Sequence, residues 1–241
     1  MSEFIRARLN LTFLASVLVL IAVPGARARA GEPVGPWEQV STDDGIVVQR
    51  RKVEGSNLKE FQGRGVIDAP LFRVLAVIRD SSKRVEWVSD CIANYTVEED
   101  DVARTQISYQ RTHAPWPVSD RDSVNRAEIQ IDSARHRVFI PFVGVTHPKV
   151  PPVKGVVRMP FVKGHWILTP VDHGKATMAE YQVHADPGGS IPDWLANIAS
   201  KKLPRDTLAG LRAQVKRRQY PEFEAKLLAA PEAKQMMEGQ N

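Results

Sequence analysis

The feature that most constrains the fold is the stretch DPGGSIPDWLAN, residues 186–197, together with the helix that it opens. The Asp-Pro-Gly-Gly segment ends a strand, Ser190 is a favourable N-cap, and a proline and an acid follow in the first turn. Apolar side chains then recur at roughly helical spacing, at Leu195, Ile198, Leu208, Leu211 and Val215. Pro204 interrupts the pattern, so we expect a kink or a short break there. A long amphipathic helix must bury its apolar stripe, and we expect it to lie against the concave face of a curved sheet, as a lid over an apolar cavity.

Turn residues divide the chain before this helix into short segments. The expected elements are a lead-in helix over 33–41 anchored by Trp37, a hairpin over 46–53 and 58–67, a helix from Asp68 to Ile78, a helical turn over 83–88, and strands over 91–98, 103–113, 122–131, 136–143, 156–170 and 175–185. This order predicts one α+β domain in which a bent antiparallel sheet grips the C-terminal helix. From Gln219 onwards we expect a frayed helix or a disordered tail, residues 219–241.

Residues 1–30 have the pattern of a secretory signal peptide. A basic start is followed by a mostly apolar run from Leu9 to Val23, which is short for a membrane span, and by a small-residue cleavage site before Gly31. The alternative is an uncleaved anchor helix. Cleavage would leave a binding domain over residues 31–218 and the tail, secreted across the inner membrane. Because the chain has one cysteine, Cys91, and so no internal disulfide, a bacterial periplasm suits it better than an extracellular medium.

Charge and composition exclude several classes of protein. The formal net charge of +5 falls to +2 without residues 1–30, which hold four basic residues and one acidic residue. No dense basic patch then remains on one element, so a nucleic-acid partner is not expected. The six histidines are scattered, so we expect no metal site and no cofactor. The sequence also has no GxSxG, HExxH or glycine-rich phosphate loop, and we therefore do not expect an enzyme.

Alternation along two predicted strands separates a mainly apolar face from a polar one. In 175–185 the apolar face carries Thr177, Ala179, Tyr181 and Val183, and in 122–131 it carries Ala127, Ile129 and Ile131. Small residues on this face would leave room for a ligand. The alternative, which alternation alone favours, is that the C-terminal helix packs directly onto them as core.

Four motifs, in this order and at these spacings, carry a resemblance to a known family. They are DGIVVQRR at 44–51, RDSSKRVEW at 79–87, PWPVSDRDSV at 115–124 and DPGGSIPDWLAN at 186–197. Over about residues 35–218 the sequence resembles the START family, the steroidogenic acute regulatory protein-related lipid transfer domains. The resemblance implies a helix-grip fold with a tunnel that holds one lipid under the C-terminal helix.

The PWPVSDRDSV motif is most similar to the phosphatidylcholine-transfer branch of this family. In that branch an arginine in the motif that matches residues 83–87 contacts the lipid phosphate, and Arg84 stands at that place. The alternative is that Arg84 lies on the surface or pairs with Glu86 or Asp80. The branch also has an acid near the choline, at the position of Val88 here, which puts choline recognition in question.

The resemblance also implies which residues meet the lipid and the membrane. The expected lining consists of Arg84, Val88, Tyr109, Ala127, Ile129, Thr177, Ala179, Tyr181, Trp194, Leu195, Ile198, Leu208 and Leu211. Trp116, in a proline-flanked loop, is expected to gate the tunnel or touch a membrane surface transiently, the alternative being loop packing.

The expected function is that of a monomer that binds one lipid, either a phospholipid or a sterol-like molecule, and carries or presents it. Two alternatives remain at this point. One is a helix-grip enzyme of the polyketide cyclase type, and the other is an interaction module that senses a lipid.

Overall fold

The structure is a computed structural model in which residues 32–238 are described, so the expected signal peptide lies outside the described residues. One sheet has the strand order β1-β2-β3-β11-β10-β8-β6-β5-β4, with β7 paired to β8 and β9 paired to β6. The strands are β1 (Pro33–Asp43), β2 (Ile46–Val53), β3 (Ser56–Ile67), β4 (Cys91–Asp100), β5 (Thr105–Thr112), β6 (Arg121–Glu128), β7 (Gln130–Asp132), β8 (Arg137–Gly144), β9 (Val157–Arg158), β10 (Phe161–Val171) and β11 (Ala176–Asp186). The helices are α1 (Leu71–Arg79), α2 (Asp193–Arg217), α3 (Pro221–Leu228) and α4 (Pro231–Glu238), with 3-10 turns η1 (Ser81–Glu86) and η2 (Ser133–Arg135).

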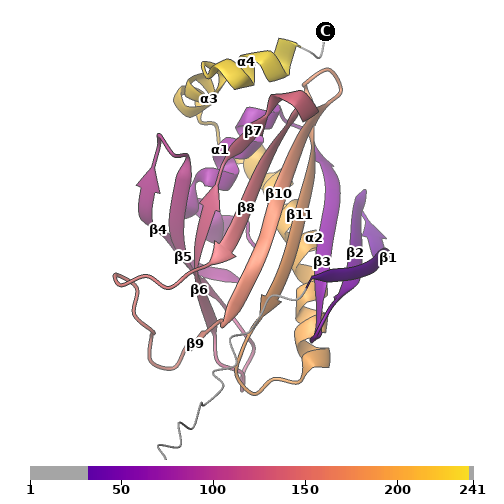
Figure 1. Ribbon diagram of the computed structural model, residues 1–241, viewed down its shortest axis with the longest axis vertical. Coiled ribbons are helices and arrows are strands. Elements are labelled where there is room, and N and C mark those ends of the chain that lie inside the picture. Colours follow the sequence, from indigo (N-terminus) through magenta and orange to yellow (C-terminus); the bar gives the residue numbers. More distant parts are fainter. Residues whose placement is uncertain (1–31, 239–241) are drawn as a thin grey trace, which may run out of the picture.

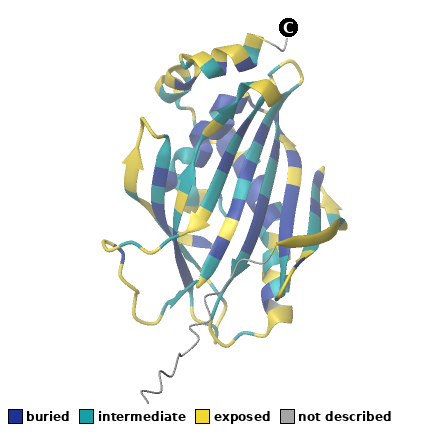
Figure 2. Cartoon of the chain, in the orientation of Figure 1, coloured by how far each residue is buried: buried dark blue, intermediate teal, exposed yellow. Residues whose placement is uncertain are grey.

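The sheet curves around α1 and α2, which confirms the predicted α+β helix-grip architecture (Figure 1). All pairs of neighbouring strands are antiparallel except β6 and β9. The main core lies where α1 and the C-terminal half of α2 meet the sheet, and Leu75, Leu168, Leu208 and Leu211 are fully buried there. Burying one such side chain contributes about 1.5–3 kcal/mol. Buried and less buried residues alternate along the strands, as Figure 2 shows.

Two glycines allow α2 to lie close to its neighbours. A Cβ atom on Gly63 of β3 would lie 2.8 Å from Cβ of Pro204, and one on Gly210 of α2 would lie 2.1 Å from the carbonyl oxygen of Trp87. The helix runs without a break through Pro204, so of the expected kink or short break, the break is absent. Packing of the proline ring against Gly63 supports the helix where one hydrogen bond is lost.

Two other predicted elements differ from the structure. Residues 33–41 form a strand rather than a lead-in helix, because this segment pairs with β2 and Trp37 packs under the guanidinium of Arg51. The described part of the expected tail is not frayed: residues 221–238 form α3 and α4, which lie together at one end of the molecule (Figure 1). Their side chains Leu227 and Met236 are buried in the main core cluster, and this burial stabilises helices too short to persist alone.

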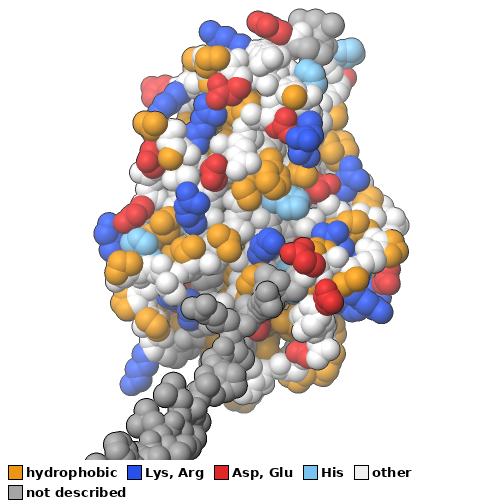
Figure 3. Space-filling model, in the orientation of Figure 1, with side chains coloured by type: hydrophobic (Ala, Val, Ile, Leu, Met, Phe, Trp, Pro, Cys, Tyr) orange, Lys and Arg blue, Asp and Glu red, His pale blue; other side chains and the backbone are white. Residues whose placement is uncertain are grey.

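Within the described residues no helix is both long enough and apolar enough to cross a membrane. On the face of the molecule in Figure 3, side chains of both charges are interspersed.

Candidate functional site

A cavity of about 340 Å³ lies between the N-terminal half of α2 and the concave face of the sheet. Its apolar wall comes from β8, β10 and β11, through Phe142, Val162, Trp166, Tyr181 and Val183. The rings of Trp166 and Tyr181 stack with centroids 4.4 Å apart, and Phe142 lies 6.0 Å from Tyr181. A Cβ atom on Gly164 would lie 2.4 Å from the Phe142 ring, so this glycine makes room for it. The result is a rigid aromatic surface along one side of the cavity.

The roof of the cavity is one face of α2 and of the segment that leads into it. Ile191, Ala196, Ala199 and Leu203 face the cavity, together with the polar residues Ser200 and Thr207. Three- and four-residue steps place these positions on one side of the helix. Because two of the apolar side chains are alanines, the helix leaves space instead of filling it.

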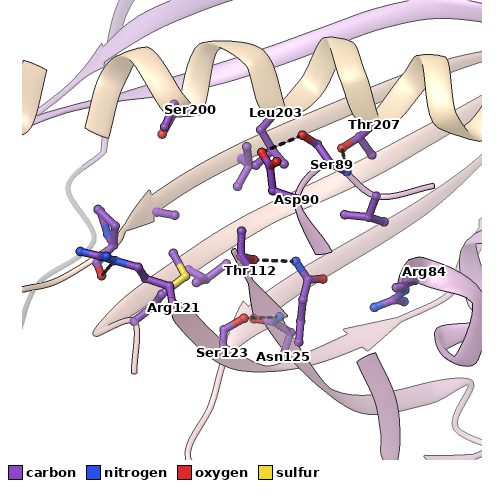
Figure 4. Close-up of a pocket in the computed structure, with 18 of the residues that line it drawn as sticks. Arg84, Ser89, Asp90, Thr112, Arg121, Ser123, Asn125, Ser200, Leu203 and Thr207 are labelled. Atoms are coloured by element: carbon purple, nitrogen blue, oxygen red, sulfur yellow. Dashed lines mark hydrogen bonds between the residues drawn. The ribbon is translucent and has the colours of Figure 1, made fainter. Parts of the chain in front are cut away.

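The opposite wall, on β5 and β6, is polar. It consists of Ser108, Gln110 and Thr112 from β5, and Ser123 and Asn125 from β6. Asn125 donates to the Ser123 hydroxyl over 2.9 Å, and Gln110 donates to Thr112 over 3.5 Å. In Figure 4, Thr112, Ser123 and Asn125 lie across the cavity from the helix residues Ser200, Leu203 and Thr207.

Arg84, on η1, occupies one end of the cavity (Figure 4). Its guanidinium donates to the Ser108 hydroxyl and the Ile78 carbonyl, both over 3.1 Å, and to the Gln106 side chain over 3.5 Å. Among the described residues it forms no ion pair with a carboxylate, and burial lowers the pKa of Arg84 from its ordinary value. Burial also raises the pKa of the neighbouring Tyr181 to about 12, so its phenol is neutral. This end therefore presents a buried positive charge that a ligand anion can neutralise.

The helices hold η1, and hence Arg84, at both ends. Asp80, just before η1, accepts a hydrogen bond from the Tyr220 hydroxyl over 2.7 Å. Glu86, at its end, accepts hydrogen bonds from Gln214 over 3.0 Å and from Arg218 over 2.9 Å. The position of Arg84 thus depends on residues from the C-terminal end of α2 and the start of α3.

At the other end of the cavity, Arg121 joins two loops. Its guanidinium donates to the carbonyl oxygens of Ser119, Pro187 and Gly188, and burial lowers the pKa of Arg121. These contacts connect the β5–β6 loop, residues 113–120, to the segment that leads into α2. Trp116, in the β5–β6 loop, is 92% exposed.

A model of the START domain matches residues 28–219 of this sequence. The chain belongs to the START domain family. A solved STAR-related lipid transfer protein from Xanthomonas axonopodis is 36% identical, covers 75% of this chain and 98% of its own, and has a TM-score of 0.68. An uncharacterised protein of Pseudomonas aeruginosa is 30% identical, with 76% of this chain and 88% of that protein covered. The phosphatidylcholine transfer protein of Mus musculus is 28% identical, with 68% of this chain and 77% of that protein covered.

The cavity of this START domain contains four of the residues expected to line it: Arg84, Val88, Ala127 and Tyr181. Ile129 lines a smaller adjoining pocket of about 30 Å³.

The other described residues of the expected lining lie elsewhere. Thr177, Ala179, Leu208 and Leu211 are completely buried core residues, and the Thr177 hydroxyl donates to the Ala69 carbonyl over 2.8 Å. Tyr109 stacks on Tyr95 and packs with Val124 and Val150 in a second cluster. Trp194 and Ile198 of α2 are 64% and 54% exposed. The side chain of Leu195 lies outside the described part of the chain.

These differences have two physical causes. Thr177 and Ala179 share a face with Tyr181, but their end of β11 meets α1 and carries core, whereas the other end borders the cavity. The apolar stripe of α2 also changes side: its C-terminal leucines face the core, while Trp194 and Ile198 face away from the cavity.

The polar wall was not predicted from the sequence. Its signal is the run of even-numbered polar residues Gln106, Ser108, Gln110 and Thr112, which alternation places on one face of β5. Which face that is follows only from the curvature of the sheet.

Proposed function

We propose that this START domain binds one amphiphilic lipid in the cavity under α2 and carries or presents it without chemical conversion. The observation that carries the proposal is a mainly apolar cavity with the buried guanidinium of Arg84 at one end. The likeness to proteins named as lipid transfer proteins supports it. Burial of the apolar part of the ligand supplies the affinity, at about 25 cal/mol per Å² before ordering costs.

Arg84 is proposed to bind the acidic group of the lipid, a phosphate or a carboxylate. Charge-assisted hydrogen bonds to such a group contribute about 1.5–3 kcal/mol each. Val88 also borders the cavity and carries no charge, and the carboxylate in this part of the lining is that of Asp90, two residues later.

The N-terminal half of α2 is proposed to act as the lid. It forms the roof with small side chains, whereas the C-terminal half is bound to η1 and to the core. Ligand exit then requires separation of the β5–β6 loop from the start of α2, which the three carbonyl contacts of Arg121 hold together.

We further propose that the mouth of the cavity touches a membrane transiently. Trp116 on the loop and Trp194 and Ile198 on α2 are exposed apolar side chains from the two segments that border this end of the cavity. Lys201 and Lys202 follow on α2 and are also exposed, which favours an anionic surface. Replacing Trp116 with serine should reduce sedimentation with anionic vesicles several-fold and leave ligand binding in solution unchanged.

The hydrogen bonds of His113 and Asp120 at the cavity mouth favour a carrier role over an enzyme. His113 at the mouth contacts the Asp120 carboxylate over 3.2 Å, but Asp120 also accepts from Arg111 over 2.6 Å and from the backbone of Ala114. Asp120 therefore organises the loop, and no hydroxyl or thiol among the described residues is hydrogen-bonded to His113 as a nucleophile. The leader-like pattern of residues 1–30 favours secretion to the periplasm.

Native mass spectrometry of the gently purified chain, followed by extraction of any adduct, tests the proposal. One co-purified amphiphile per chain is the expected result. A mass that stays free of adduct after incubation with a total bacterial lipid extract would refute the carrier role.

A further inference from the structure

The polar wall forms a continuous strip along the cavity. In the register of β5 and β6, Ser108 lies opposite Asn125 and Gln110 lies opposite Ser123, so the polar side chains form two neighbouring cross-strand pairs on the same face of the sheet. Thr112 extends the strip, and its cross-strand partner is Arg121. At about 3.3 Å per residue the strip from Ser108 to Thr112 is roughly 13 Å long. It begins at Arg84 and ends near Arg121.

Apart from the Tyr181 hydroxyl and the Trp166 indole nitrogen, the wall on the other half of the sheet offers apolar surface over the same length. Val162, Trp166, Tyr181 and Val183 present rings and branched chains, and the Phe142 ring lies between them and the polar strip. On the sheet, a ligand in the cavity therefore meets hydrogen-bonding groups on one side and mainly apolar groups on the other, while the roof adds the hydroxyls of Ser200 and Thr207. An acyl chain is apolar on every side, and it would cover the strip without bonding to it, which costs free energy.

The strip has hydrogen-bonding capacity left over. Ser108 accepts from Arg84 and Ser123 accepts from Asn125, so each hydroxyl retains its own proton for a further bond. The side-chain oxygen of Asn125 has no hydrogen-bond partner among the described residues either, but this atom is fully buried and presents no surface to the cavity. Hydroxyl groups along one edge of a ligand can bond to the Ser108 and Ser123 hydroxyls.

The size of the cavity points in the same direction. An apolar cavity of about 150 Å³ holds one benzene ring. A cavity of about 340 Å³ therefore has room for a compact fused-ring ligand.

We propose that the ligand is a rigid, facially amphipathic molecule of the hydroxylated steroid-acid type. Its hydroxyls lie against Ser108, Ser123 and Asn125, its apolar face lies on Trp166 and Tyr181, and its acid group binds Arg84. This inference rests on the proposed lipid-binding function and narrows the class of ligand.

Isothermal titration calorimetry with matched probes tests this assignment. Cholate has hydroxyls along one face and a carboxylate, whereas lithocholate shares the skeleton and the carboxylate but lacks the hydroxyls in the middle of the skeleton. Palmitate and 1-palmitoyl lysophosphatidylcholine represent chain ligands. The unmodified chain should bind cholate about 10-fold more tightly than lithocholate and more tightly than either chain ligand.

Two cavity variants and one control complete the experiment. Asn125→Leu and, as a milder change, Ser123→Ala should weaken cholate binding about 10-fold and leave lithocholate binding unchanged. Arg126→Leu alters the next residue of β6, which is exposed on the other face, and should change neither affinity.

Tighter binding of palmitate or the lysophospholipid than of both steroid acids, undiminished in Asn125→Leu, would overturn the inference and leave the lipid-carrier function standing. Equal affinity for the two steroid acids would mean that the strip only holds water, and would also overturn it. Binding of none of the four probes would count against the carrier function itself.

Discussion

The concave face of the sheet has two halves that the same strands build in different ways. On β10 and β11, Leu168 and Ala179 are fully buried against the helices, whereas Trp166 and Tyr181, two residues further along the same face, border the cavity. Helix α2 shows the same contrast: leucines at its C-terminal end enter the core, and alanines at its N-terminal end leave space. Alternation along a strand therefore identifies the inner face, but the element opposite decides whether that face becomes core or cavity.

The largest expected effect on stability lies in the half of the concave face that is packed as core. Leu208→Ala removes a fully buried side chain of α2 and should lower the free energy of unfolding by about 2–5 kcal/mol, since the rigid surroundings cannot close the space. Leu203→Ala is the matched change in the half that borders the cavity, and it should cost less because the side chain already borders empty space. Urea denaturation of both variants checks the contrast, and equal losses would mean that the two halves are packed alike.

Filling the cavity should weaken ligand binding without lowering the stability of the fold. Ala196→Phe places a ring in the cavity from the roof, and it should weaken ligand binding about 100-fold while the melting temperature stays within a few degrees. Ile198→Phe, two residues later on the exposed side of α2, serves as control. Titration of a co-purified ligand into both variants gives the answer, and unchanged affinity in Ala196→Phe would place the ligand elsewhere.

Removing the positive charge of Arg84 should change which ligands the cavity prefers. Arg84→Met should weaken binding of an acidic amphiphile about 10- to 100-fold and leave a neutral sterol unaffected, because only the acid uses the guanidinium. Paired titrations with an acid and an alcohol of the same skeleton measure the difference. An equal loss for both would assign Arg84 a purely structural role.

The smallest effect concerns the contact that holds η1 to α3. Burial opposes ionisation of Asp80, but hydrogen bonds from Ser82 and Tyr220 outweigh it and lower the pKa of the carboxyl below 3.8. Its stabilising contribution is therefore present above that pH and is lost as the pH falls through the lowered pKa. Tyr220→Phe should cost about 1 kcal/mol at neutral pH and progressively less below pH 3.8. Denaturation at several pH values tests this, and a cost that does not change with pH would contradict the role of the Asp80 carboxylate.

The sequence motifs were sufficient for the family and the fold class, and Arg84 borders the cavity as the resemblance implies. They could not separate lining from core, since Thr177 and Tyr181 lie on the same face of one strand and differ only in what covers them. Residues 33–41 were misassigned because pairing with β2, a tertiary interaction, overrides weak local preference. Helices α3 and α4 were missed for the same reason, since buried side chains such as Leu227 stabilise them.

The five tryptophans give the molecule a built-in optical readout. Trp87 and Trp166 border the cavity with ring centroids 6.3 Å apart, whereas Trp116 and Trp194 are exposed near its mouth and Trp37 is half-buried on β1. A ligand changes the surroundings of Trp87 and Trp166 and leaves them shielded from iodide in solution. Attachment to a vesicle instead shields Trp116 and Trp194. Emission wavelength and iodide quenching, recorded on one unlabelled sample, can therefore follow filling of the cavity and docking on a bilayer as two separate events.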